Sequence, residues 1–251
     1  MQLNRNALRT LQSGFTLAEA ATVLVIVALV LGGMLIGLPT QLENARLSEA
    51  RTQSDNISAA LVGYALRQEY LPCPDTNGDA LEEPRAPATG ACPSQEGWLP
   101  SATLGVNQAD PWGSRVRYRV APEFSNANTP ITLATTAANP LQVCADQPCT
   151  TPLAQDVPAV WVMHGRNALG ARNSHFTLNA ATPATSDERD NANGRNLTDT
   201  ADAACPAACR FIMHQPQDAN PPTIPFAFDD IVNWLPLGIL LSRMTEAGAI
   251  P

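Results

Sequence analysis

One short segment carries the residue types of a metal site. The five residues from Asp75 to Asp79 read Asp-Thr-Asn-Gly-Asp and place side-chain oxygens at alternate positions. Oxygen ligands at this spacing open the calcium-binding loops of helix–loop–helix proteins. Two features depart from that loop: Ala80 replaces its glycine, and Ala86 stands where its bidentate glutamate belongs. Turns rich in Asp and Asn also form without metal. The segment therefore predicts either a calcium site at Asp75, Asn77 and Asp79 or a metal-free turn.

Residues for catalysis are less well organised. The chain has three histidines, His164, His175 and His214, and two of them end predicted strands, where a histidine in the core or at a sheet edge is common. The sequence lacks the G-x-S-x-G, H-E-x-x-H and C-x-x-C motifs and a phosphate-binding glycine loop. We therefore expect the protein not to be an enzyme.

A long apolar run follows the start of the chain. Residues Ala20 to Leu38 hold no charge, and Thr22 is their only polar side chain. As a helix the run is roughly 28 Å long, about the thickness of the hydrocarbon core of a bilayer. The preceding segment, Met1 to Gly14, carries Arg5 and Arg9 and no acid. This asymmetry predicts a membrane helix with the basic segment in the cytoplasm and the rest of the chain outside.

Glu19 lies at the edge of this run and is the one carboxylate beside it. By itself it is consistent with an acid that complements the dipole at a helix start. However, Gly14-Phe15-Thr16-Leu17-x-Glu19 after a short basic segment resembles the processing site of type IV prepilins and type II secretion pseudopilins. The resemblance implies that a membrane peptidase cuts after Gly14 and methylates the new amine of Phe15. It also implies that Glu19 pairs with the terminal amine of a neighbouring subunit in a filament.

The resemblance gives the chain an organisation and a role. It implies a leader at 1–14, a transmembrane and filament-core helix at 15–39, and an extracytoplasmic head at 40–251. The protein would be a minor pilin or a related structural subunit in the inner membrane, with its head in the periplasm and later at the cell surface. Its partners would be other pilin subunits, prepilin peptidase, the inner-membrane assembly platform and the membrane. The alternatives are a type II secretion pseudopilin or a membrane-anchored periplasmic binding or enzymatic domain.

The same resemblance offers a second place for calcium. Pseudopilins resembling this chain bind calcium in a loop near the C-terminus. The sequence does not fix an alignment there. The acids that could correspond are Asp187, Asp190, Asp229 and Asp230.

The six cysteines fall into three close pairs. Because the membrane helix would place them outside the cytoplasm, where disulfides persist, we favour disulfides in sequential order. The pairs are Cys73 with Cys92, Cys144 with Cys149, and Cys205 with Cys209. A zinc site formed by the last four cysteines is the rival interpretation, although neither spacing is the usual C-x2-C.

The elements that position these residues follow from periodicity. Apolar residues recur at helical spacing from Thr40 to Tyr70, which continues the apolar run as an amphipathic helix, with Pro39 as a bend. Residues 115–120 alternate strictly, which predicts a strand with three arginines on a solvent-facing side. Further strands are expected at 131–134, 141–144, 159–164 and 210–214, a surface loop at 179–204, and a helical turn near 229–234. The predicted fold is α+β: a long N-terminal helix, half of it transmembrane, packed on a small antiparallel sheet in a loop-rich, disulfide-stapled head.

Composition limits the choice of partner. The chain has 251 residues and a formal net charge of −8, with 22 prolines and few aromatic residues. An acidic surface argues against broad binding to nucleic acid, which depends on the neutralisation of phosphates by basic side chains. The sequence therefore gives no evidence for a nucleic-acid partner, and it leaves a small local basic patch open.

Overall fold

The computed structural model describes residues 16–35, 38–138, 141–146, 149–150, 152–183, 186–192, 209–220 and 226–250, without the side chains of 31–39 and of Cys209. The chain divides into two compact units, Met1–Ala45 and Arg46–Pro251. Gly14, Phe15 and Cys205 lie outside the described residues.

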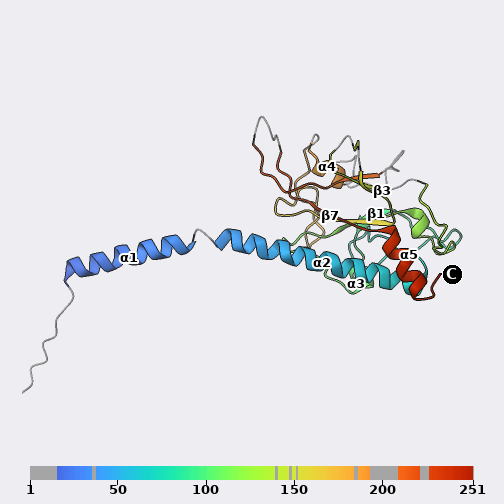
Figure 1. The fold of residues 1–251 in the computed structure, drawn as a ribbon, viewed down its shortest axis with the longest axis horizontal. Helices are drawn as coiled ribbons and strands as arrows, with labels where there is room; N and C mark the ends of the chain where they lie inside the picture. The colour runs from blue at the N-terminus through green and yellow to red at the C-terminus, as the bar shows by residue number, and fades with distance from the viewer. Residues whose placement is uncertain are drawn as a thin grey trace, which may run out of the picture. The chain divides into compact units, whose positions relative to one another are not determined.

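The N-terminal part forms two helices where the sequence predicts one long helix. Helix α1 spans Leu17–Leu35 and α2 spans Leu38–Gln68 (Figure 1). The prediction of one long helix is therefore wrong. The sequence of the junction accounts for the break, because Gly32, Gly33 and Gly37 are poor helix formers and Pro39 fits only the first turn of a new helix.

The predicted membrane span is also wrong. Among the residues that the structure describes, no helix is both long and apolar enough to cross a membrane. This finding overturns the predicted location, a single-pass anchor in the inner membrane with a periplasmic head.

The second unit is α+β and holds two small sheets. The first sheet has the order β1-β2-β5-β7, and all its neighbours are antiparallel. The second has the order β4-β3-β6, with β3 antiparallel to β4 and parallel to β6. The second sheet is therefore mixed, where the sequence predicts a single antiparallel sheet. The strands are β1 (Glu96–Trp98), β2 (Arg117–Val120), β3 (Leu141–Cys144), β4 (Pro152–Val157), β5 (Ala159–Met163), β6 (Cys209–Ile212) and β7 (Ile231–Leu235).

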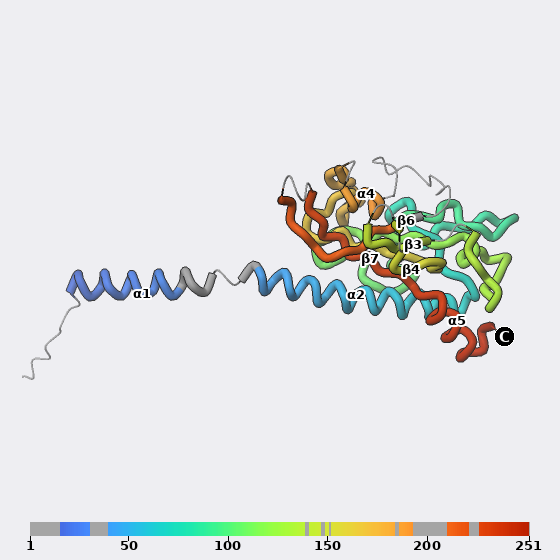
Figure 2. Tube along the Cα trace, turned by 45° about the horizontal axis from the view of Figure 1, so that its top comes forward, coloured from blue at the N-terminus to red at the C-terminus, as the bar shows by residue number. Residues whose placement is uncertain are grey.

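Shorter helices lie between these strands and, in the case of α5, after the last of them. They are α3 (Ser101–Leu104), the 3-10 helix η1 (Pro122–Phe124), α4 (Glu188–Asn191) and α5 (Leu237–Glu246). Figure 2 shows α2 running along the strands and α5 beside the C-terminal end of α2. Three predictions fail here: 131–134 is not a strand, the predicted loop at 179–204 contains α4, and 231–235 is a strand where a helical turn is expected.

The core lies between α2 and the first sheet. Ile57 and Leu61 of α2 are fully buried, and so are Tyr118 of β2 and Trp161 of β5. The indole Nε1 of Trp161 donates a hydrogen bond to Ser54 Oγ at 3.1 Å, which joins the middle of the sheet to the helix. A helix with one apolar stripe becomes stable when that stripe is covered, so the sheet is what holds α2 in place.

The two arginines of β2, and Arg115 just before the strand, are buried. The prediction that they face solvent is therefore wrong. Arg115, Arg117 and Arg119 are 5%, 2% and 6% exposed. Arg117 Nη1 lies 3.0 Å from Glu96 Oε1, and Arg119 pairs with the other oxygen of the same carboxylate. The guanidinium of Arg117 also stacks 4.6 Å above the ring of Trp98. Strict alternation identified the two faces of the strand, but it could not show that an acid and an aromatic ring cover the charged one.

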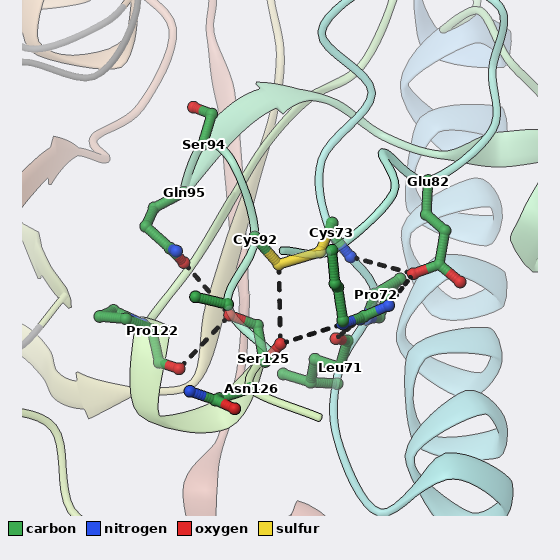
Figure 3. The surroundings of a disulfide bond; sticks show 12 residues. Leu71, Pro72, Cys73, Glu82, Cys92, Ser94, Gln95, Pro122, Ser125 and Asn126 are labelled. Carbon is green, nitrogen blue, oxygen red and sulfur yellow. Dashed lines mark hydrogen bonds and ion pairs between the residues drawn. A yellow bond between two sulfur atoms is a disulfide. The ribbon is translucent and has the colours of Figure 1, made fainter. Parts of the chain in front are cut away.

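A disulfide fixes the segment that follows α2. Cys73 is bonded to Cys92, and Cys144 to Cys149, in the sequential order that the sequence favours. Figure 3 shows Cys73 and Cys92 between Glu82 and Ser125. The backbone N–H of Cys73 donates to Glu82 Oε2 at 3.4 Å. The disulfide and this carboxylate together hold residues 71–92 against the head.

Removing the first disulfide should destabilise the head more than removing the second. In the chain-entropy model, the 19-residue separation of Cys73 and Cys92 corresponds to about 3 kcal/mol and the 5-residue separation of Cys144 and Cys149 to about 2 kcal/mol. We expect C73S/C92S to lower the free energy of unfolding more than C144S/C149S does in urea titrations. Equal losses would show that loop closure is not the source of the stability.

Candidate functional site

The first candidate site is the N-terminus of α1. The backbone N–H of Glu19 donates to Thr16 Oγ1 at 3.2 Å, and the backbone N–H of Thr16 donates to Glu19 Oε2 at 2.9 Å. This reciprocal pair is a capping box, in which Thr16 and Glu19 satisfy each other's backbone donors at the helix start. The hydrogen bonds from Thr16 lower the pKa of Glu19 and favour its carboxylate form. Glu19 is therefore charged and held at the first turn of the helix.

Residues 17–30 of α1 present an uncovered apolar surface. Leu17, Leu24 and Leu29 are 89%, 69% and 72% exposed. Val23, Val25, Ile26, Val27 and Val30 are also exposed. Isolated exposed apolar side chains are common in proteins, but a continuous apolar helix surface marks an interaction site.

The Asp75 segment is a turn in which nearby backbone N–H groups donate hydrogen bonds to the carboxylate of Asp75. Asp75 is fully buried, and its Oδ1 accepts hydrogen bonds from the N–H groups of Asn77 at 3.1 Å and Gly78 at 2.6 Å. Its Oδ2 accepts from the N–H of Ala80 at 2.8 Å and lies 3.5 Å from Arg115 Nη1. Both oxygens that a cation needs already have donors. The geometry therefore favours the metal-free interpretation for this segment.

Ala80 completes this turn in an unfavourable conformation. Its φ is +68°, the left-handed region that glycine adopts without steric cost. Calcium loops carry their invariant glycine at the same place in the turn. The chain thus makes the turn without the residue that suits it, and backbone strain is the consequence.

The second candidate site is an acidic cluster formed by Glu188, Asp229 and Asp230. One carboxylate oxygen from each lies within 4.8 Å of the others. Glu188 comes from α4, and the two aspartates precede β7, so residues about forty apart in sequence meet here. Glu188 and Asp230 are 0% and 2% exposed. Both aspartates were predicted from the sequence, but Glu188 was not, because the polar pattern of residues 179–204 indicated a surface loop.

Hydrogen bonds fix each carboxylate of the cluster. Glu188 Oε1 accepts from the N–H of Asp229 and from Asn167 Nδ2, both at 2.8 Å. Asp230 Oδ1 lies 3.1 Å from His164 Nδ1, and Asp230 Oδ2 accepts from Asn191 Nδ2 at 2.9 Å. Asp229 Oδ1 is buried and has no hydrogen-bond partner in the described structure. The cluster is therefore preorganised and leaves one carboxylate oxygen uncommitted.

Gly165 allows this packing. Its φ is +56°, and a Cβ atom there would lie 2.6 Å from Asp229 Oδ1 and 2.3 Å from the backbone oxygen of Asp229. Any side chain at this position would force the aspartate out of the cluster. Gly165 is thus a positioning residue for Asp229.

Burial and mutual repulsion set the protonation of the cluster. Burial, with the neighbouring charge of Asp230, raises the pKa of Glu188 to about 8. Burial raises the pKa of Asp229 to about 6. Three carboxyl groups so close together must share protons or a cation. Oxygen ligands of this kind suit Ca²⁺ or Mg²⁺, and Glu188, Asp229 and Asp230 are the residues that would hold the ion.

The other predicted residues are used elsewhere. Asp187 Oδ2 pairs with His214 Nε2 at 3.2 Å, and Asp190 Oδ2 pairs with Arg210 at 3.2 Å. The predicted zinc ligands Cys144 and Cys149 are consumed by their disulfide. His175, which sequence analysis left without a role, contacts neither candidate site through a described hydrogen bond: its N–H donates to Asn173 Oδ1.

Replacing Ala80 with glycine should stabilise the head. Glycine adopts the φ of +68° without steric cost, so A80G should raise the free energy of unfolding by about 0.5–1 kcal/mol, measured in urea. A102G, at an exposed position of α3, is the matched control and should destabilise. A loss of stability in A80G would contradict the strain described for this turn.

The acidic cluster should make stability depend on pH. The pKa of Glu188 in the folded protein, about 8, exceeds its ordinary value of 4.5. Its contribution to the free energy of unfolding is therefore fully present below pH 4.5 and is lost as pH rises towards 8. With chelator at pH 8, E188Q should be more stable than the wild type by about 1 kcal/mol or more. E246Q, at an exposed carboxylate of α5, should show no such gain.

Calcium should make the wild type more stable than E188Q. Millimolar calcium should raise the melting temperature of the wild type by mass action and leave E188Q unchanged. D75A should keep the calcium response, because Asp75 belongs to the metal-free turn. If calcium raises the melting temperature of E188Q but not of D75A, the ion binds at the Asp75 segment. If calcium does not change the melting temperature of the wild type, neither site binds it.

Comparison with known proteins assigns neither site. No family model, no curated protein and no solved structure matches the chain.

Proposed function

We propose that the protein is a pilin-like structural subunit, a minor pilin, that is cut after Gly14, methylated on Phe15 and assembled into a filament of the type IV pilus kind. The observation that carries the proposal is the apolar surface of α1, which begins one turn after the processing motif. A structural subunit needs no catalytic residues of its own, since the peptidase does the chemistry. Its partners would be further subunits, prepilin peptidase and the assembly platform of the filament machine.

The shape of the apolar surface supports assembly into a bundle. Exposed side chains of α1 include Leu24, Val25, Ile26 and Val27, four consecutive residues that face all sides of a helix. A helix that is apolar on all sides is stable only when it is surrounded. Two subunits cannot cover each other's helices in this way, so the surface favours a bundle of several subunits over a simple dimer.

Glu19 supplies the polar contact in that bundle. Among the described residues, its carboxylate is hydrogen bonded to Thr16 alone, and Glu19 is exposed. In an apolar bundle the charge needs a cationic partner, and the amine that cleavage creates on Phe15 of another subunit provides one. The pairing would also fix how far one subunit is displaced along the next.

The acidic cluster supports a second candidate function. The resemblance to pseudopilins implies a calcium site near the C-terminus, and Glu188, Asp229 and Asp230 lie beside the last strand. A type II secretion pseudopilin is therefore the second candidate. A calcium requirement for assembly would favour it over a pilus subunit.

Replacing Glu19 should separate processing from assembly. We expect E19A to be cleaved normally and to be incorporated into filaments at a level lower by roughly tenfold or more, because the amine of the neighbouring subunit loses its counter-charge in the bundle. Incorporation is measured by immunoblotting of sheared filaments against total protein.

The control is E246A, which removes an exposed carboxylate of α5 that contacts Ser242 and Arg243 of the same helix. It should assemble like the wild type. Normal incorporation of E19A, with cleavage intact, would refute the intersubunit pairing of Glu19.

A further inference from the structure

The Asp75 turn contains an Asn-Gly dipeptide, Asn77-Gly78, at the surface. The side chain of Asn77 is exposed, and Gly78 has a φ of +90°. Glycine leaves its own backbone nitrogen unhindered by a Cβ atom. Because residue 78 has no Cβ atom to shield it, its backbone nitrogen can attack Cγ of the preceding Asn77 side chain through a five-membered ring.

Asp75 is placed as a base for this nitrogen. Its Oδ1 accepts the N–H of Gly78 at 2.6 Å, the shortest of its contacts. Asp75 is fully buried, so its carboxylate is held against this nitrogen by the head. A carboxylate within hydrogen-bond distance of the proton that it must remove meets the geometric requirement for general-base catalysis.

Asp79 acts on the other end of the reacting group. Its backbone N–H donates to Asn77 Oδ1 at 2.8 Å, and its Oδ2 accepts from Asn77 Nδ2 at 3.2 Å. The N–H would stabilise negative charge developing on Oδ1 during attack at Cγ. The carboxylate lies against the nitrogen that would leave.

Neighbouring side chains hold the dipeptide in this arrangement. A Cβ atom on residue 78 would lie 2.6 Å from Cγ of Phe176, so only glycine fits beneath that ring. Phe176 itself packs against Trp98, with ring centroids 6.2 Å apart, and against the guanidinium of Arg115 at 5.0 Å. The turn is thus pressed against the head, and its reactive atoms are ordered before reaction.

We propose that Asn77-Gly78 is a self-modification site at which the fold promotes deamidation. The nitrogen of Gly78 attacks Cγ of Asn77, a new C–N bond closes a succinimide ring, and the amide proton passes to Asp75. The bond between Cγ and Nδ2 then breaks, and Nδ2 leaves as ammonia with a proton returned through solvent and the Asp79 carboxylate. Water opens the ring at either carbonyl, which gives aspartate or isoaspartate at position 77.

The product changes the turn. A new carboxylate at position 77 replaces the amide that donated to Asp79, so two negative charges face each other across that contact. The three alternate positions 75, 77 and 79 then all carry carboxylates. The isoaspartate product also adds one methylene to the backbone, which disturbs the hydrogen bonds that Asp75 accepts.

The test compares the same dipeptide in the folded and the unfolded protein. The full chain is incubated near pH 8 with and without concentrated urea, reduced and digested after arginine, and the amide-to-acid mass change at Asn77 is followed by mass spectrometry. Asn193-Gly194, the second Asn-Gly dipeptide of the chain, is the internal reference for intrinsic reactivity. We expect Asn77 to react faster in the folded than in the unfolded chain, and at the rate of Asn193 when both are unfolded.

Variants locate the catalytic groups. D75N should slow the folded reaction by about tenfold or more, because it removes the base, and its circular dichroism spectrum shows whether the head is folded. D79A keeps the backbone N–H, removes the carboxylate beside Nδ2 and should slow the reaction less. Slower reaction of Asn77 in the folded than in the unfolded chain would overturn the proposal, as would equal folded rates in the wild type and in folded D75N and D79A.

Discussion

The packing of α2 on the first sheet is the interaction on which the head depends. Ile57 and Leu61 are fully buried against Tyr118 and Trp161, and the hydrogen bond from Trp161 to Ser54 fixes their register. Strand β7 is the last strand of that sheet, so its position depends on the packing of the sheet against α2. Asp229 and Asp230 directly precede β7 and meet Glu188 there. The acidic cluster thus exists because the helix–sheet core places the start of β7 beside α4.

The spacing of residue types along the chain predicted the features that depend on residues close together in sequence. The amphipathic stripe of α2, the α+β class and the two described disulfides follow from spacing along the chain. Burial by distant segments was not predictable in this way. The arginines of β2 looked solvent-exposed because alternation cannot reveal that Glu96 and Trp98 cover them. Glu188 was missed for the same reason: its partners Asn167 and Asp229 are distant in sequence.

The N-terminal part shows a different limit. The uncharged run at residues 20–38 predicted a membrane span, but this part of the chain belongs to two helices, α1 and α2. No described helix is both long and apolar enough to be a membrane span. The motif at residues 14–19 does not depend on that prediction. The capping box between Thr16 and Glu19 gives the carboxylate a defined place at the helix start, and the apolar surface behind it needs cover.

The proposal that this surface is covered by other subunits requires that the chain is processed first. The most direct measurement is the intact mass, with N-terminal fragment sequencing, of the protein isolated from cells that contain active prepilin peptidase. The account predicts a chain that begins at Phe15 and carries one methyl group on its terminal amine. A chain that retains Met1 to Gly14 in such cells would contradict it.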